Sequence, residues 1–309
     1  MFNSFFALGA TALELGLISS LTVLALFLSY SMLNVCDLST DGCFTLGAAV
    51  GAVVAISGHP YLSLGAAICA GMVSGFITAL LQTKMGIDSL LSEIIVNTGL
   101  YSVNIAIMGG ASLLNMNKTE TVFTKAKMLF AHSFIGPQYR LVVVITIVTL
   151  ALVLLTWFLK TRLGLAIRAT GNNPDMVKSS SINPTFTTIV GLCLSNSLTA
   201  LSGCLLAQSQ KSVNVTIGSG MVTIALASLL IGRAFMGKGG IGKRAVGAVL
   251  GAFVFRLVYT IALRFNLPAY MLKLVSSVIV IIAIAGPYFK QRLPELKRIR
   301  KASKGDRHA

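Results

Sequence analysis

LVVVITIVTLALVLLTWFL, residues 141–159, is an unbroken apolar stretch without a charged side chain. A bilayer core of about 30 Å needs roughly 20 helical residues to cross, so this stretch predicts a transmembrane helix. Similar blocks of about 16 to 24 residues recur along the 309-residue chain, which is 55% hydrophobic and only 11% charged. A soluble domain carries about 25% charged residues. The composition therefore excludes soluble domains, and the block length excludes transmembrane strands of about 10 residues.

The same criterion predicts an all-α polytopic membrane protein with about nine transmembrane helices, within a range of eight to ten. The predicted spans are 12–33, 43–58, 61–82, 89–109, 141–159, 185–208, 219–236, 245–264 and 269–288. They make up one transmembrane domain, residues 1–289. A basic tail, residues 290–309, follows it.

The net charge of +16 comes from basic residues gathered in the tail and in two short segments, 160–178 and 233–244. Lys84 is the first basic residue in the chain. The positive-inside rule places such segments in the cytoplasm, which leaves 110–139, 209–218 and the N-terminus outside. Nucleic-acid binding would need interleaved aromatics, which the tail lacks, so no nucleic-acid partner is expected. Attraction of the tail to anionic membrane lipid is a secondary expectation.

Two predicted spans are short and interrupted by polar residues or glycine. Asp37, Asp41 and Gly42 directly precede the block 43–58, and residues 213–221 lead through Gly218 and Gly220 into the short span 219–236. Irregular backbone inside a membrane is tolerated where it lines a cavity, and paired short segments of this kind often mark a transporter's binding region. The alternative is that both are ordinary loops at the membrane surface.

Candidate catalytic and metal-binding groups are sparse. The three histidines, His59, His132 and His308, lie in loops or the tail, and neither HExxH nor GxSxG occurs. GKGGIGKR, residues 237–244, matches a phosphate loop except that Arg244 stands where Ser or Thr should hold magnesium. It also follows an apolar span rather than a strand, so we interpret it as a basic cytoplasmic turn. No catalytic residue, metal site or cofactor is predicted in this chain.

The predicted cytoplasmic segment LGLAIRATGNNPDMVKSSSINP, residues 163–184, contains the signals of a short helix. Asn172 or Asn173 can cap it, Pro174 fits its first turn, and Asp175 is favourable to its dipole. An exposed helix of about two turns is suited to docking in a groove of a soluble partner. By spacing alone, a plain connection between spans is the favoured interpretation.

This segment resembles the coupling helix of ABC importer permeases of the branched-chain amino acid/ribose type. The resemblance extends to DLSTDGCFTLGAAVGA (37–52), LYSVNIAIMGGASLL (100–114) and GSGMVTIALASLLIG (218–232), in order and over most of the chain. These segments resemble a subgroup paired with lipoprotein binding proteins for aromatic or related amino acids. Glu93, where the subgroup has a small residue, and Arg233, where it has an acid, depart from that pattern.

The resemblance implies a permease subunit, not an enzyme, in a bacterial inner membrane, as a homodimer or as a heterodimer with a similar chain. A separate ATPase would carry ATP and magnesium and would dock through Asn172, Asn173, Asp175, Met176, Lys178 and Ser179. An extracytoplasmic binding protein would deliver a small polar solute, expected to be an amino acid, to the 110–139 and 209–218 loops.

Polar residues inside the spans are candidates for the translocation path: Asp37, Thr40, Asp41, Asn97, Tyr101 and Asn104. The last three are spaced i, i+4 and i+7 and so share one helix face. That face could instead make interhelical hydrogen bonds. Three charged residues need partners as well. For Arg256, near mid-span, we favour a structural role over contact with the substrate. For Glu93 and Arg233 we hypothesise an ion pair.

Two other classes of protein remain. A self-sufficient ion-coupled transporter or channel would need clustered membrane carboxylates, whereas those here are scattered along the sequence. An integral membrane enzyme would need a His/Asp or metal constellation near an interface. The coupling-type helix without a phosphate loop favours the importer permease over both. The sequence leaves the substrate open among an amino acid, a sugar and a nucleoside.

Overall fold

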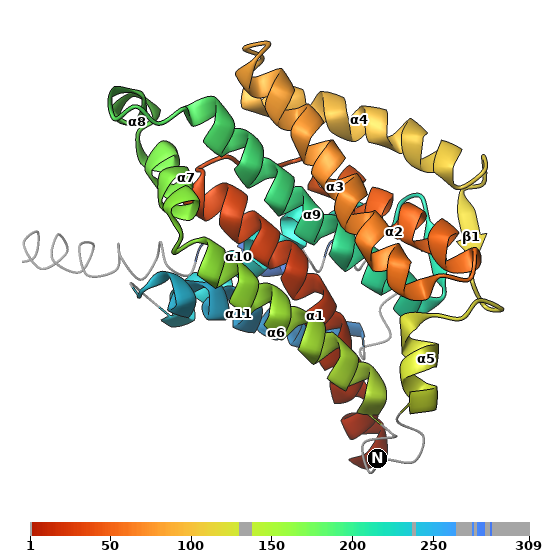
Figure 1. Cartoon of the computed structure of the whole chain (residues 1–309). Helices are drawn as coiled ribbons and strands as arrows, with labels where there is room; N and C mark the ends of the chain where they lie inside the picture. The colour runs from red at the N-terminus through yellow and green to blue at the C-terminus, as the bar shows by residue number, and fades with distance from the viewer. Residues whose placement is uncertain are drawn as a thin grey trace, which may run out of the picture.

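The computed structural model describes residues 2–129, 138–236, 239–263, 274, 277–281 and 285, without the side chains of residues 2–8, 10, 11, 129 and 263 (Figure 1). The described part is helical apart from two short strands and the connecting turns. Its elements are α1 (Phe2–Met32), α2 (Thr40–Ile56), α3 (Pro60–Thr83), α4 (Ser89–Ile107), β1 (Leu113–Asn115), α5 (Val122–Leu129), α6 (Tyr139–Phe158), α7 (Arg162–Asn172), α8 (Pro174–Ser179), α9 (Pro184–Gln210), β2 (Ser212–Asn214), α10 (Met221–Met236) and α11 (Ile241–Leu263).

The predicted polytopic helical architecture is confirmed. Among the described residues, six helices are long and apolar enough to cross a membrane: Ala12–Met32 within α1, α3, α4, α6, α9 and most of α11. The two interrupted spans correspond to the shorter apolar helices α2 and α10. The ninth predicted span, 269–288, lies mostly outside the described residues, although positions 274, 277–281 and 285 within it are helical.

Helix α9 is the central element, and α1, α2 and α3 pack around it (Figure 1). Its small polar residues bond to the backbone of a neighbour. The Ser195 hydroxyl donates to the Ala25 carbonyl at 2.9 Å, and the Ser202 hydroxyl donates to the Ile18 carbonyl at 2.7 Å. These bonds satisfy hydroxyls that lipid could not, and they hold α1 antiparallel to α9.

Glycines let α2 and α3 approach the α9 backbone closely. A Cβ atom on Gly47 of α2 would overlap the carbonyl of Ala200, and one on Gly71 of α3 would overlap the carbonyl of Asn196. Gly51 and Gly75 follow at a spacing of four residues. A Cβ atom on Gly75 would overlap the carbonyl of Leu192, and one on Gly51 would overlap the Cys204 side chain. Such small-xxx-small stripes are typical of helix contacts in membranes, where packing rather than water exclusion drives association.

The helix boundaries follow local sequence signals. The Asp88 side chain accepts the Leu90 N–H at 2.9 Å at the start of α4, and the Asn183 side chain accepts the Thr185 N–H at 3.0 Å at the start of α9. α9 also begins on a proline, Pro184, whose missing N–H costs nothing at that position.

The segments predicted as outer loops contain structure that was not predicted. β1 pairs antiparallel with β2, with Leu114 opposite Val213, and α5 lies between β1 and α6. Each strand has only three residues, too few to show an alternating pattern. Each strand also pairs with one about a hundred positions away, so no local sequence signal predicts this two-stranded sheet.

Candidate functional site: two helix starts that meet inside the membrane region

The starts of α2 and α10 meet through one carboxylate. Asp41, in the first turn of α2, accepts the backbone N–H of Gly220 at 2.8 Å and that of Val222 at 2.9 Å. Both N–H groups belong to the beginning of α10, where a helix has no backbone partner for its first donors. The negative charge of Asp41 is therefore favourable to the N-terminal dipoles of two helices at once.

This junction lies at the depth of the middle of α9. The Cys43 thiol donates to the Asn196 carbonyl at 3.3 Å, and Asn196 is near the centre of the 27-residue helix Pro184–Gln210. Gly218, which leads into α10, packs on the carbonyl of Asp41, and its N–H donates to the Thr45 hydroxyl at 3.2 Å. The two broken spans therefore start level with the middle of α9 and not with either of its ends.

Asp37 and Thr40 fix the turn before α2. Asp37 is fully buried, and one of its carboxylate oxygens accepts both the N–H of Ser39, at 2.9 Å, and the Ser39 hydroxyl. The Thr40 hydroxyl donates to the Asp37 carbonyl at 2.8 Å. Both predicted path residues are thus engaged in local backbone geometry.

The predicted stripe on α4 is only partly assembled. Asn104 is buried and donates to the Gly42 carbonyl at 3.1 Å, and the Asn97 side chain lies directly against Gly42. Tyr101 faces away, with 52% of its surface exposed. The structure therefore brings Asn97 and Asn104 to the junction and leaves Tyr101 outside it. Asn104 thus makes an interhelical hydrogen bond, which is the alternative role for this face.

Glu93 supports the same junction from α4. One of its carboxylate oxygens accepts the Leu38 N–H at 3.0 Å, and the other accepts the Gln82 side-chain amide at 3.2 Å. The hypothesis of a Glu93–Arg233 ion pair is wrong in this structure. Among the described residues no ion pair joins Glu93 to Arg233, which is exposed at the C-terminal end of α10, away from the end that meets α2.

We expect Glu93→Gln and Arg233→Gln to be additive in a double-mutant cycle, within about 0.5 kcal/mol, because the two side chains share no partner. Thermal unfolding of the detergent-purified protein measures this. A cycle between Glu93→Gln and Gln82→Ala is the matched control and should show coupling. Coupling of Glu93 to Arg233, but not to Gln82, would contradict the hydrogen bonds described here.

Arg256 has a partner on its own helix. Its guanidinium lies over the Tyr259 ring, 5.1 Å from the ring centre, and its Cβ contacts Gly16 of α1. Cation–π contact of this kind stabilises a cation away from bulk water. The structure thus supports the structural role favoured from the sequence.

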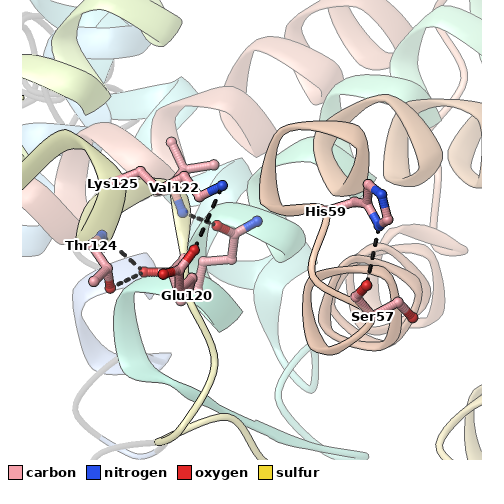
Figure 2. Close-up of polar contacts among 8 residues, drawn as sticks. Ser57, His59, Glu120, Val122, Thr124 and Lys125 are labelled. Atoms are coloured by element: carbon pink, nitrogen blue, oxygen red, sulfur yellow. Dashed lines mark hydrogen bonds and ion pairs between the residues drawn. The ribbon is translucent and has the colours of Figure 1, made fainter.

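A second polar cluster joins α5 to the ends of α3 and α9, at the predicted outer surface (Figure 2). The Val122 N–H donates to the Gln208 side chain at 2.9 Å, and Gln208 in turn donates to the Ser63 hydroxyl at 2.6 Å. Lys125 pairs with Glu120 at 3.6 Å, and a His59 ring nitrogen lies 3.1 Å from the Ser57 carbonyl oxygen. No local sequence pattern marks this cluster, because its members come from distant segments.

The predicted short helix is present as α8. Asn173 is its cap, and its side-chain oxygen accepts the N–H groups of Asp175 and Met176, both at 3.0 Å. Val177 is buried against the helices beside it, whereas Met176 has 62% of its surface exposed. The remaining residues of the predicted docking set, Asn172, Asp175, Lys178 and Ser179, are exposed too. One apolar side chain therefore anchors α8 and another points outward from it.

Long apolar helices around a central helix, with two shorter helices that start at mid-depth, define a multi-pass helical membrane transporter. The chain belongs to the family described as branched-chain amino acid transport system / permease component, which matches residues 10–284. It is thus the permease subunit of an ABC importer, located in the inner membrane.

Individual relatives agree with this family. The chain is 33% identical to a tyrosine transport system permease protein of Clostridioides difficile over 87% of this chain and 88% of that protein. It is 30% identical to an uncharacterized protein of Rickettsia prowazekii, over 89% and 96% of the two chains. It is 25% identical to the ribose import permease protein RbsC of Escherichia coli, over 82% and 78%. No solved structure matches the chain.

Proposed function

We propose that this permease imports an amino acid, with an aromatic one as the first to test, and that it does so as a dimer driven by a separate ATPase. The similarity to a tyrosine transport permease supports the substrate class, and the ribose permease is the more distant of the two relatives. A binding protein would deliver the solute to the outer surface built by α5 and the two-stranded β1–β2 sheet. Nine spans with the basic segments in the cytoplasm remain part of this proposal.

The path for the solute would follow the junction of α2, α4 and α10. Asp41 and Asn97 are half-buried there, and Gly42 keeps that part of α2 free of a side chain. Backbone that is irregular at mid-depth can rearrange between outward and inward states without breaking a complete helix. Of the six predicted path residues, Asp41 and Asn97 are therefore the two we place on the path.

The observation that carries the ATPase proposal is the build of α8. The Asn173 side chain caps two backbone N–H groups at the start of α8, and the buried Val177 anchors the helix. The Met176 side chain is apolar and exposed. A rigid element with one exposed apolar anchor suits insertion into a groove on a partner.

We expect Met176→Asp to reduce the amount of ATPase that co-purifies in mild detergent at least tenfold, which corresponds to about 1.4 kcal/mol of binding free energy. The matched control is Met85→Asp, because Met85 has the same exposed fraction, 62%, and follows α3 on the same predicted side. The measurement is quantitative mass spectrometry of the purified complex, with amino-acid uptake in proteoliposomes as a second readout. Equal retention of the ATPase by both variants would refute docking through α8.

A further inference from the structure

A groove runs along the membrane-facing side of the protein between α6 and α3, with α9 as its floor. In Figure 1, α3 lies along one side of α9, and α6 lies on the other side, beyond α1. The groove has a volume of about 390 Å³, within the range of about 300–1,000 Å³ that small-molecule sites occupy. Leu150 and Leu154 form part of one wall, Ile68 lies on the other side, and Leu198 and Leu201 belong to the floor. We name it the α6–α9 groove.

The chemistry of the α6–α9 groove fits a hydrocarbon chain. Among the described residues that line the groove, Ser197 alone has a hydroxyl, and that hydroxyl already donates to the Leu194 carbonyl at 2.7 Å. A polar occupant would thus find no free hydrogen-bonding side chain along this lining, apart from the indole N–H of Trp157. An acyl chain needs none, and it is the solvent that surrounds a membrane helix.

The length and depth of the groove fit one leaflet. Its residues on α6 run from Ile147 to Phe158, which is about 16 Å at about 1.5 Å per residue. The hydrocarbon core of a bilayer is about 30 Å thick, so the groove covers half of it. Trp157 marks one end of the groove, and tryptophan is enriched at the level of lipid headgroups.

Basic residues stand at the same end. Lys160 and Arg162 follow α6 directly and are exposed, on the side that the charge distribution predicts to be cytoplasmic. Among the described residues, neither of them forms an ion pair with an acidic side chain. A phosphate of an anionic headgroup is a suitable counter-charge at this depth.

We propose that the α6–α9 groove binds the acyl chain of an anionic phospholipid of the cytoplasmic leaflet, with the headgroup at Lys160 and Arg162. The lipid fills the space over α9 that no described side chain covers. The lipid also holds α6 in place beside α9, the helix that follows α8. This site is separate from the solute path at the junction of α2 and α10.

The test uses the full permease in vesicles of equal phosphatidylglycerol and phosphatidylethanolamine, followed by native mass spectrometry of the lipids retained in detergent. Ser197→Phe fills the floor of the groove, and we expect at least fivefold lower occupancy by phosphatidylglycerol. Ile145→Phe is the control, because Ile145 is an exposed α6 residue outside the groove lining. Unchanged retention in Ser197→Phe would overturn the proposal.

The headgroup is tested separately. Lys160→Gln combined with Arg162→Gln should reduce the preference for phosphatidylglycerol over phosphatidylethanolamine at least threefold, whereas Lys84→Gln, at the end of α3, should leave it unchanged. If the preference for phosphatidylglycerol is the same in the double variant as in Lys84→Gln, the headgroup does not bind at Lys160 and Arg162.

A phospholipid with a photoreactive acyl chain tests the unmodified protein, so the result does not depend on whether Ser197→Phe folds. We expect cross-links to concentrate on α6 and α9. An even distribution over the membrane-facing helices would overturn a specific site. A photoreactive amino acid at Leu154 that links two copies of the chain would show a subunit interface in the groove instead, and would equally overturn it.

Discussion

Replacement of Asp41 by alanine is expected to lower binding-protein-stimulated ATP hydrolysis of the assembled importer at least tenfold. The carboxylate holds two N–H groups at the start of α10. Hydrogen bonds to a charged acceptor contribute about 1.5–3 kcal/mol each. Without them two helix N-termini face each other inside the membrane region with no negative charge between them. The α2–α10 junction should then lose its fixed geometry.

Asp88→Ala is the control for this effect. Asp88 also caps a helix, but it accepts an N–H of its own helix, α4, at an exposed position. Loss of such a cap costs about 1 kcal/mol of stability, and the cap connects α4 to no second helix. Asp41→Asn, which keeps one acceptor oxygen, should fall between the two. Stimulated hydrolysis and an unfolding temperature equal to those of the parent in Asp41→Ala would show that the junction does not need this carboxylate.

Gly71→Leu is expected to prevent accumulation of folded protein in the membrane. A side chain at Gly71 meets the carbonyl of Asn196 and the methyl group of Ala200, so α3 must move away from the central helix. Overpacking of a core costs about 1–3 kcal/mol when side chains can adjust, and a clash with backbone exceeds that range. Size-exclusion chromatography in mild detergent, with expression level as a second readout, measures the effect.

The same helix supplies the matched control. A Cβ atom on Gly65 meets no atom within 4 Å, so Gly65→Leu adds the same side chain on the membrane-facing side of α3. We expect Gly65→Leu to express and elute like the parent. Gly71→Ala should be intermediate, since it brings the same first clash without the rest of the side chain. If Gly71→Leu and Gly65→Leu behave alike, close packing of α3 on α9 is not required for folding.

The spans could be predicted because membrane helices are set by one local quantity, the length of the apolar stretch. Eight of the nine predicted spans match described helices, and α8 was found from the residues Asn173 and Pro174, which act within one turn. The β1–β2 sheet and α5 could not be predicted in this way. Their contacts, such as the Val122 N–H with Gln208, join segments 86 positions apart.

The candidate site was predicted at the level of residue type but not of partner. The sequence marked Asp41 and Gly220 as parts of two broken spans, yet it could not show that one caps the other. It also offered Arg233 as the counter-charge for Glu93, since both lie at span ends of the same predicted side. The fold instead gives Glu93 a backbone N–H and an amide. Pairing by charge fails here because packing decides which helix ends are neighbours.

The unbroken length of α9 has a thermodynamic consequence. Its 27 residues extend about 40 Å, from the capped turn after α8 to the strand β2 at the opposite surface. If α8 docks the ATPase as proposed, a displacement of α8 is transmitted through the rigid helix α9 to the opposite surface. Linkage then makes the exchange reciprocal: the factor by which a bound ATPase changes the affinity for the binding protein is the factor by which the binding protein changes the affinity for the ATPase.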